Sequence, residues 1–215
     1  MRELISAFER DGCTVVPSVV TEQQLTFATA YCDSVELSGA GTRDLLELPW
    51  CADIARTLRL IIPISTLLGE SRTAVQCTLF VKNAQRNWLV PLHRDYSVPV
   101  KARVASSHWS AWSIKQSVQF GRPPQCVLET LLAVRIYLQD TDASNGALQV
   151  VKGSHRSTAI TGKRSSHFVP RGGALVMRPL LLHASSKLVT GSRHVLHFLF
   201  GPGELPDGAE WANAI

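Results

Sequence analysis

The sequence has no apolar run that approaches the ~18 consecutive residues needed to cross a bilayer. Its first residues, Met1-Arg2-Glu3-Leu4, are charged at once, so the apolar core of a signal peptide is missing. The five cysteines are scattered and none is paired as C-x-x-C, which argues against a disulfide framework and against a zinc knuckle. We therefore expect a soluble protein of the reducing cytoplasm that does not bind membranes.

A concentrated basic stripe is also absent. The formal net charge is +5 and the pI is about 9.1, but Lys and Arg are dispersed along the chain. Nucleic-acid-binding proteins usually gather these residues on one face, so nucleic-acid binding is not expected. A mild positive field of this kind favours an anionic small ligand, or simply reflects a solvated surface with more basic than acidic residues.

What the chain does have is enough apolar material for a substantial core, since 45% of its 215 residues are hydrophobic. This length fits a single domain over residues 1–215. We expect a helical front at 1–70 and a β-rich core at 73–200. Within that core, residues 96–130 form a less regular insert, typical of a lid or substrate loop, with a short helix near its end.

The helical front contains residues that typically start or end helices. Thr21 and Gln24 have the spacing of a capping box at the start of a helix, which Gly39-Ala40-Gly41 should break. Pro49 suits the first position of the next helix. Pro63 should bend or end that helix before Gly69.

The rest of the chain reads as short strands separated by turns. Asn145-Gly146 is a short-hairpin signal that should pair the strand at 131–139 with one at 147–151. Further strands are expected at 73–82, around Val90, and at 174–177, 180–184 and 194–200. Many short strands behind a helical front predict a mainly β (α+β) fold, with a β-sandwich or jelly-roll barrel buttressed by N-terminal helices.

The chemistry centres on the only His-x-Asp in the sequence, His93-Arg94-Asp95. In a strand, residues i and i+2 point to the same face, so His93 and Asp95 can converge while Arg94 faces away. An imidazole and a carboxylate are two of the three ligands of the facial triad of non-haem Fe(II) oxygenases. The same tripeptide opens the catalytic loop of protein kinases, but the Gly-rich loop and the Asp-Phe-Gly of a kinase are missing here.

His183 is the best candidate for a third ligand. By strand alternation it shares a face with Ser185, and Arg193 follows across a turn that should form a hairpin. An arginine placed there can bind a carboxylate with two parallel hydrogen bonds, and the serine hydroxyl can add another. Each of the remaining histidines could be a ligand but reads more simply as a surface or core residue: His108, His155, His167, His194 and His197.

Arg135 lies in an apolar strand, where a charged residue is almost never left unpaired. Two interpretations stay open for it. The guanidinium faces the site, or it pairs with an acid such as Asp140 or Asp142.

Together these residues resemble the phytanoyl-CoA dioxygenase-like family of Fe(II)/2-oxoglutarate oxygenases. The resemblance covers about residues 75–200. The motifs that carry it are Leu92-His93-Arg94-Asp95, the block from Asn145-Gly146-Ala147-Leu148 to Gly153-Ser154-His155-Arg156, Gly172-Gly173-Ala174-Leu175, and His183-Ala184-Ser185 with Arg193.

The resemblance implies a double-stranded β-helix (jelly-roll) core with iron held by His93, Asp95 and His183. It also implies that Arg193 and Ser185 grip the distal carboxylate of 2-oxoglutarate. Further candidates for the pocket wall or for substrate contact are Lys82, Trp88, Trp112, Arg135 and His155.

The implied reaction is hydroxylation of an unactivated C–H of a small-molecule substrate by Fe(II) and O2, with 2-oxoglutarate converted to succinate and CO2. Relatives that form carbon–halogen bonds replace the carboxylate ligand with a small residue, so the presence of Asp95 favours hydroxylation. Two other hypotheses remain open. One is a jelly-roll small-molecule-binding protein without turnover, and the other is a metal-dependent hydrolase or isomerase that uses the same triad. The substrate's identity and the oligomeric state are not determined by the sequence.

Overall fold

The computed structural model describes residues 2–35, 41–43, 45–70, 72–158 and 160–215. Its strands form a six-stranded sheet in the order β1-β11-β8-β13-β3-β2, a four-stranded sheet in the order β10-β9-β12-β4, and a three-stranded sheet in the order β5-β7-β6. All strand pairs are antiparallel. The strands are β1 Cys13–Val16, β2 Gly41–Thr42, β3 Thr73–Lys82, β4 Val90–His93, β5 Val98–Val100, β6 Ser110–Lys115, β7 Val118–Arg122, β8 Leu132–Tyr137, β9 Leu148–Val150, β10 Ser165–His167, β11 Ala174–Met177, β12 His183–Ser185 and β13 Arg193–Gly201.

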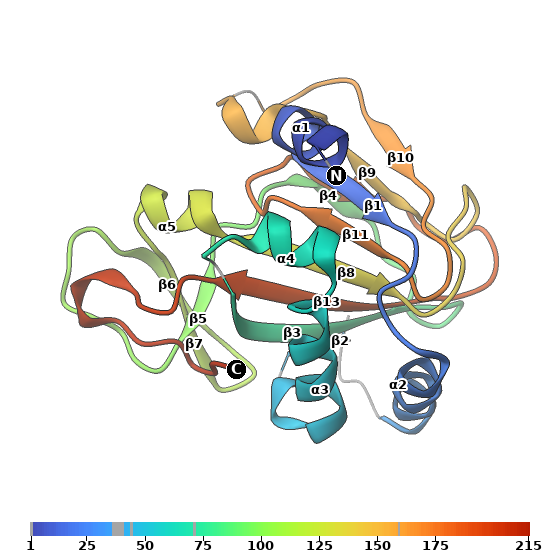
Figure 1. Cartoon of the computed structure of the whole chain (residues 1–215), viewed down its shortest axis with the longest axis horizontal. Helices are drawn as coiled ribbons and strands as arrows, with labels where there is room; N and C mark the ends of the chain where they lie inside the picture. The colour runs from blue at the N-terminus through green and yellow to red at the C-terminus, as the bar shows by residue number, and fades with distance from the viewer. Residues whose placement is uncertain (1, 36–40, 44, 71, 159) are drawn as a thin grey trace.

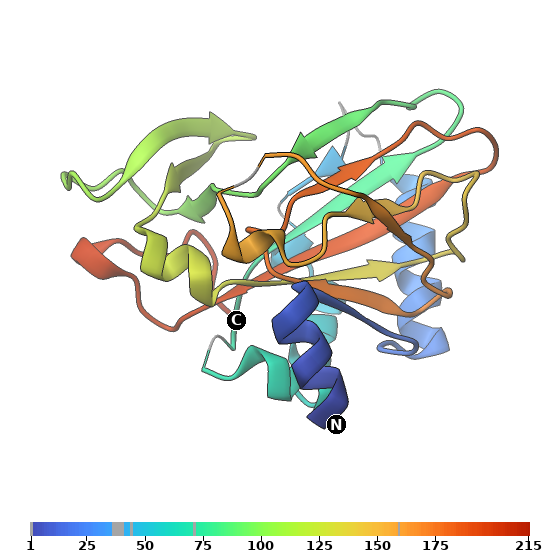
Figure 2. The same ribbon diagram turned by 90° about the horizontal axis from the view of Figure 1, so that it is seen from above.

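The four-stranded sheet lies against one face of the six-stranded sheet, and helices lie against the other face (Figures 1 and 2). These helices are α1 Arg2–Asp11, α2 Glu22–Ser34, α3 Pro49–Leu58 and α4 Ile62–Leu68. Alternate side chains of β8 point to opposite faces of the six-stranded sheet. Val134 and Ile136 pack among the helices, whereas Ala133 and Tyr137 pack in the cluster between the sheets. The predicted jelly-roll core with N-terminal helices is therefore confirmed.

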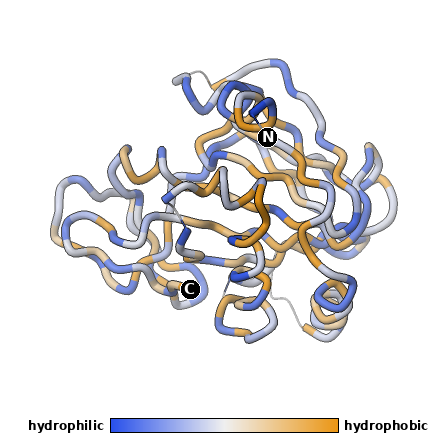
Figure 3. Tube along the Cα trace, in the orientation of Figure 1, coloured by the Kyte–Doolittle hydropathy of each residue, from blue (hydrophilic) through white to orange (hydrophobic). Residues whose placement is uncertain are grey.

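The hydrophobic residues lie mainly where the layers pack against each other. Figure 3 shows hydrophobic residues concentrated along the central strands and on the helices that cover them. Among the described residues, the structure contains no helix long and apolar enough to span a bilayer. The division into a single domain stays a prediction.

Some of the predictions for the helical front are confirmed and one is wrong. The capping box is present, since Thr21 Oγ1 accepts from the backbone N–H of Gln24 and the Gln24 side chain accepts from the backbone N–H of Thr21. Pro49 begins α3 as predicted. The prediction for Pro63 was wrong: α3 already ends at Leu58, and Pro63 lies in the first turn of α4, where its missing N–H has no partner to lose. Positions 39 and 40 of the predicted break lie outside the described residues.

The hairpin predicted across Asn145-Gly146 was also wrong. The strand before it, β8, belongs to the six-stranded sheet, whereas β9 after it pairs with β10 and β12 in the other sheet. A turn signal reports only that the chain reverses. Which strand receives the returning segment is decided by where its apolar face can be buried.

The insert at 96–130 is more regular than expected. Strands β5, β6 and β7 form their own sheet at one end of the molecule (Figure 1), and α5 Gln125–Thr130 follows as predicted. A separate apolar cluster supports it, in which Trp109 and Trp211 are buried with Val98 and Leu128. This small core, which includes Trp211 from the C-terminal segment, explains why the insert is ordered.

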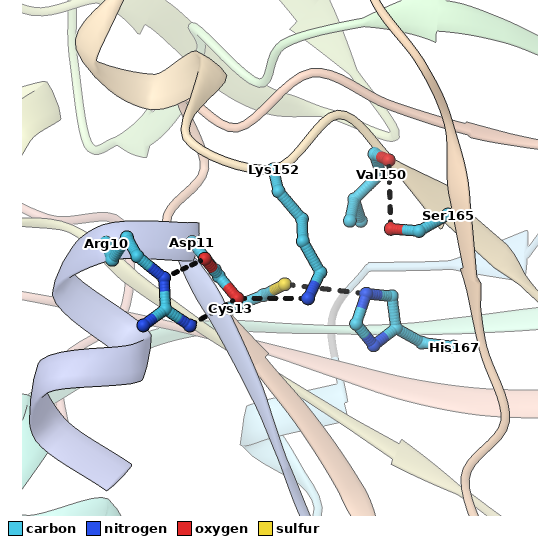
Figure 4. Close-up of polar contacts among 7 residues, drawn as sticks. All are labelled: Arg10, Asp11, Cys13, Val150, Lys152, Ser165 and His167. Atoms are coloured by element: carbon cyan, nitrogen blue, oxygen red, sulfur yellow. Dashed lines mark hydrogen bonds and ion pairs between the residues drawn. The ribbon is translucent and has the colours of Figure 1, made fainter. Parts of the chain in front are cut away.

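Polar contacts fasten α1 and β1 to the edge of the four-stranded sheet (Figure 4). Asp11 forms ion pairs with Arg10 at 2.8 Å and with Lys152 at 3.0 Å. The Cys13 thiol lies 3.7 Å from His167 Nε2. Burial raises the pKa of Cys13 to about 12, so this cysteine is a thiol at neutral pH and not a nucleophile.

Candidate active site

A cavity of about 510 Å³ contains the predicted site. It is lined by residues from both main sheets and from the three-stranded sheet. The lining residues include Gln76, Thr78 and Phe80 of β3, Trp88, His93, Asp95, Tyr96, Lys115, Phe120, Arg135, Leu148, His183, Ser185, Arg193, His197 and Leu199.

His93, Asp95 and His183 meet at this cavity. Their ligand atoms all lie within 4.8 Å of one another, a grouping that could hold a metal ion. Asp95 Oδ1 lies 3.6 Å from His93 Nε2, and Asp95 Oδ2 lies 3.5 Å from His183 Nε2. The two imidazole rings have centroids 4.2 Å apart because His93 and His183 are paired in register across β4 and β12.

Both imidazoles are oriented by their own strands. His93 Nδ1 lies 2.8 Å from the carbonyl oxygen of Pro91, and His183 Nδ1 lies 2.8 Å from that of Leu181. A carbonyl can only accept, so each Nδ1 carries a proton. This is the arrangement found for metal-binding histidines, in which the second ring nitrogen is fixed by an outer partner. His183 Nε2 keeps its lone pair, whereas the hydrogen bond with Asp95 favours a second proton on His93 Nε2 and raises the pKa of His93 until a metal takes that position.

Asp95 lies just beyond the end of β4, where its backbone N–H donates to the carbonyl of Pro179. Burial acts to raise its pKa, but His183 and the hydrogen bond with His93 outweigh this effect and hold the pKa of Asp95 well below its usual range. Burial lowers the pKa of His183 to about 4, against the opposing effect of Asp95. The result at neutral pH is a carboxylate beside a neutral imidazole, the charge states that bind a divalent metal.

A second group of side chains in the site is basic. Lys82 is fully buried, and its Nζ donates to Ser185 Oγ at 2.8 Å and to the Ser186 carbonyl at 2.7 Å. Arg193 Nη1 donates to the same hydroxyl at 3.1 Å. Ser185 Oγ in turn donates to the carbonyl of Gly146 at 3.0 Å. The serine therefore joins two cations through one oxygen.

This basic group has unused hydrogen-bonding capacity. Among the described residues, none of Lys82, Arg135 and Arg193 forms an ion pair with a carboxylate. The Nε atoms of Arg135 and Arg193 and the hydroxyl of Tyr137 are buried without a partner. Buried polar groups are rarely left unsatisfied, so these donors fit an anionic ligand with several acceptor oxygens, as a dicarboxylate has.

Arg193 reaches Ser185 by a different route from the predicted hairpin. Strands β12 and β13 belong to different sheets, and Arg193 crosses the gap between them. Gly146 makes room for this approach. It has φ +71°, and a Cβ there would lie 2.8 Å from the Ser186 carbonyl and 3.7 Å from Arg193 Nη1.

The remaining candidates divide into two sets. Trp88 lines the cavity and its ring lies 5.1 Å from Lys82 Nζ, while Arg135 lines the cavity and donates to His197 Nδ1 at 2.8 Å instead of pairing with Asp140 or Asp142. Lys82 donates to the lining residue Ser185 but is not itself among the lining residues, and neither are Trp112 and His155. Trp112 stacks on Trp109 with ring centroids 5.6 Å apart, and His155 packs against Gly12 at the end of α1.

His197, Thr78 and Gln76 line the cavity but were not singled out from the sequence. A signal exists for the two residues of β3. In β3, polar residues recur at every second position from Gln76 to Lys82, with only Phe80 as an apolar member. Polar side chains on one face of an otherwise apolar strand indicate a buried polar site.

A jelly roll that encloses two histidines and a carboxylate is the architecture of the non-haem iron oxygenases. A family model described as Phytanoyl-CoA dioxygenase (PhyH) matches residues 8–195. The chain belongs to this family, whose members are Fe(II)/2-oxoglutarate-dependent enzymes. No curated protein sequence matches it significantly.

Solved structures share the fold at low identity. HygX from Streptomyces hygroscopicus, crystallised with nickel and 2-oxoglutarate bound, is 19% identical with a TM-score of 0.68, covering 96% of this chain and 89% of that one. The 2-oxoglutarate-dependent epimerase SnoN from nogalamycin biosynthesis is 16% identical with a TM-score of 0.70, covering 96% and 86%. The carbocyclase SnoK from the same biosynthesis is 13% identical with a TM-score of 0.67, covering 95% and 85%.

Proposed function

We propose that this protein is an Fe(II)/2-oxoglutarate-dependent dioxygenase that hydroxylates an unactivated C–H bond of a small-molecule substrate. The observation that carries the proposal is the convergence, at one cavity, of the metal-binding group with a buried basic group that has no carboxylate partner. HygX, with nickel and 2-oxoglutarate bound, provides a parallel on the same fold.

The metal would be held by His93 and His183 through Nε2 and by one oxygen of Asp95. The two histidines come prepared for this role, because their Nδ1 protons are already used by backbone carbonyls. The carboxylate supplies negative charge against the cation. Three ligands on one face leave other positions of an octahedral ion open for exchangeable groups.

The cosubstrate's far carboxylate would be bound by Arg193, with Lys82, Ser185 and Arg135 around it. Fe(II) and 2-oxoglutarate together supply the oxidising chemistry, in which O2 is consumed and succinate and CO2 are released. The protein's contribution is to hold the reactants in place and to exclude water. Phe80, Leu148 and Leu199 line the cavity with apolar surface and serve the second purpose.

Succinate release tests the proposal directly. Purified protein with Fe(II), ascorbate, 2-oxoglutarate and O2 should release succinate, and omission of iron should stop it. A metal-dependent hydrolase or isomerase would turn over its substrate without 2-oxoglutarate. A binding protein without turnover would bind metal and 2-oxoglutarate but release no succinate under any substrate pool.

The mass of the product distinguishes hydroxylation from the other outcomes that this fold supports. Incubation with a metabolite pool should yield a product heavier by one oxygen atom. Loss of two hydrogens would instead indicate ring closure, as the name carbocyclase describes for SnoK, and an unchanged mass would indicate epimerisation, as for SnoN. Either result would overturn hydroxylation and keep the oxygenase assignment.

The affinity for 2-oxoglutarate should fall as pH rises above neutrality. Burial, together with the neighbouring Arg193 and Arg135, lowers the pKa of Lys82 to about 7. Only the ammonium form attracts a carboxylate, so the free protein must take up a proton to bind the ligand above this pH. The Kd of the Ni(II)-loaded protein for 2-oxoglutarate, measured by calorimetry, should therefore rise by up to about tenfold per pH unit above the pKa.

A matched variant isolates the lysine. Lys82→Arg keeps the positive charge at every pH in this range and should remove most of the pH dependence. A flat profile in the unmodified protein, or the same slope in the arginine variant, would contradict the role of Lys82.

A further inference from the structure

Three basic residues of the cavity take no part in the group around Ser185. One of them, Arg94, donates to the backbone carbonyls of Leu180, Ser154 and Ser157. The other two are Arg43 and Lys115. Arg43 directly follows β2, and Lys115 is the last residue of β6. Within the described part of the chain, neither side chain has an ion pair or a side-chain hydrogen bond. Lys115 Nζ contacts only the ring of Phe120, 4.6 Å from its centroid. The cavity thus presents a second pair of cations without a dedicated partner.

The turn between β6 and β7 fixes these two residues near each other. Gln116 accepts a hydrogen bond from the backbone N–H of Arg43 at 3.0 Å and donates to the carbonyl of Gly41 at 3.2 Å. The turn residues Gln116 and Ser117 have φ of +49° and +65°, values that residues other than glycine rarely adopt. The hydrogen bonds of Gln116 therefore join the β6–β7 turn to β2 and to Arg43. Because Lys115 immediately precedes this turn, it lies at the cavity beside Arg43.

The charges around this pair differ from those around Arg193. Burial lowers the pKa of Lys115, Arg43 lowers it further, and Asp95 opposes the shift. Lys82, by contrast, is influenced by Arg193 and Arg135. Asp95 is the only carboxylate among the described lining residues. A divalent metal bound to Asp95 would neutralise its negative charge and leave less of it to balance Arg43 and Lys115. With metal bound, the cavity would have a clear excess of positive charge at Arg43 and Lys115.

We propose that the primary substrate carries an anionic group, a carboxylate or a phosphate ester, that is bound between Arg43 and Lys115. The inference rests on the proposed function, in which 2-oxoglutarate occupies the other basic group. Phe120, whose ring Lys115 contacts, and Tyr96 also line the cavity and offer aromatic surface for an apolar body. The substrate class is therefore a compact organic anion with an apolar or aromatic portion next to its charged group.

A matched set of three probes tests the charge preference without any turnover. Phenylacetate, phenylacetamide and phenethylamine share a ring and differ in carrying an anionic, a neutral or a cationic group. We expect phenylacetate to bind the protein loaded with Zn(II) and saturated with 2-oxoglutarate at least about tenfold more tightly than the amide. The amine should bind most weakly. Ligand-observed NMR titration measures all three.

Variants locate the effect. Arg43→Gln with Lys115→Gln should reduce the preference for phenylacetate over the amide to about twofold or less. Lys163→Gln with Arg164→Gln removes the same charge from exposed positions outside the cavity and should leave the preference unchanged. Equal binding of acid and amide, no detectable binding of phenylacetate, or a preference that survives in the cavity variant would each overturn the proposal.

Failure here is distinguishable from failure of the proposed function. The Kd for 2-oxoglutarate in the same Zn(II)-loaded samples reports the other basic group. The Arg43 and Lys115 variant should leave that Kd within about twofold of the original value. If it rises in parallel, the pair serves the cosubstrate and the substrate-class proposal is wrong. If the unmodified protein binds no 2-oxoglutarate at all, the oxygenase assignment fails first.

Discussion

Replacing His183 by alanine should abolish 2-oxoglutarate turnover while leaving the fold intact. The side chain is 4% exposed and its Nε2 faces Asp95, so the substitution removes one of three converging ligand atoms. Loss of an outer-shell partner of a metal ligand typically costs ~10–100-fold in metal affinity or activity. Loss of a ligand itself should cost more than that. Succinate release by the purified variant, with iron supplied in excess, measures the effect.

The fold should survive because the imidazole contributes little else. Its only other hydrogen bond among the described residues is to the carbonyl of Leu181, and most single substitutions cost about 0.5–3 kcal/mol of stability. Thermal unfolding followed by circular dichroism checks this point. His155→Ala is the matched control, because His155 lies beside Gly12 and does not line the cavity. Turnover in the His183 variant at the level of the control would refute the ligand assignment.

Replacing Arg193 by alanine should mainly raise the KM for 2-oxoglutarate. The guanidinium is 3% exposed and has an unpaired Nε, and burial lowers its pKa only to about 10, so it stays charged at neutral pH. A hydrogen bond to a charged group contributes about 1.5–3 kcal/mol. At 1.4 kcal/mol per tenfold, this predicts an increase in KM of roughly 10–100-fold with a much smaller change in kcat.

The split between KM and kcat is the informative measurement. Arg103→Ala serves as control, because that arginine is exposed over the ring of Trp112 and does not line the cavity. Arg193→Lys should recover part of the affinity, since it keeps the charge but loses the planar fork. An unchanged KM in the alanine variant would reject the role, and a collapse of kcat alone would indicate that Arg193 supports the fold or the metal group instead.

Short-range patterns in the sequence predicted much of this protein correctly. Three features that depend only on neighbours in the chain are present in the structure. They are the capping box at Thr21, the strand at 73–82 and the apolar strand that leads into His93. Signals that depend on distant partners failed. Asn145-Gly146 turns the chain into the opposite sheet, and Pro63 begins a helix that sequence alone could not separate from α3.

By itself the sequence determined which residues could carry the chemistry: a His-x-Asp, a distal histidine with a serine two residues on, and an arginine after the next turn. The sequence also offered Lys82 and Arg135 as candidates for the pocket, and only the tertiary structure decided that these two and His197 join the site. These three are brought to the site from β3, β8 and β13, and their neighbours in the chain do not show which distant side chains they meet. The physical reason is that side-chain alternation fixes the face of a strand that a residue occupies, whereas the packing of two sheets fixes what that face meets.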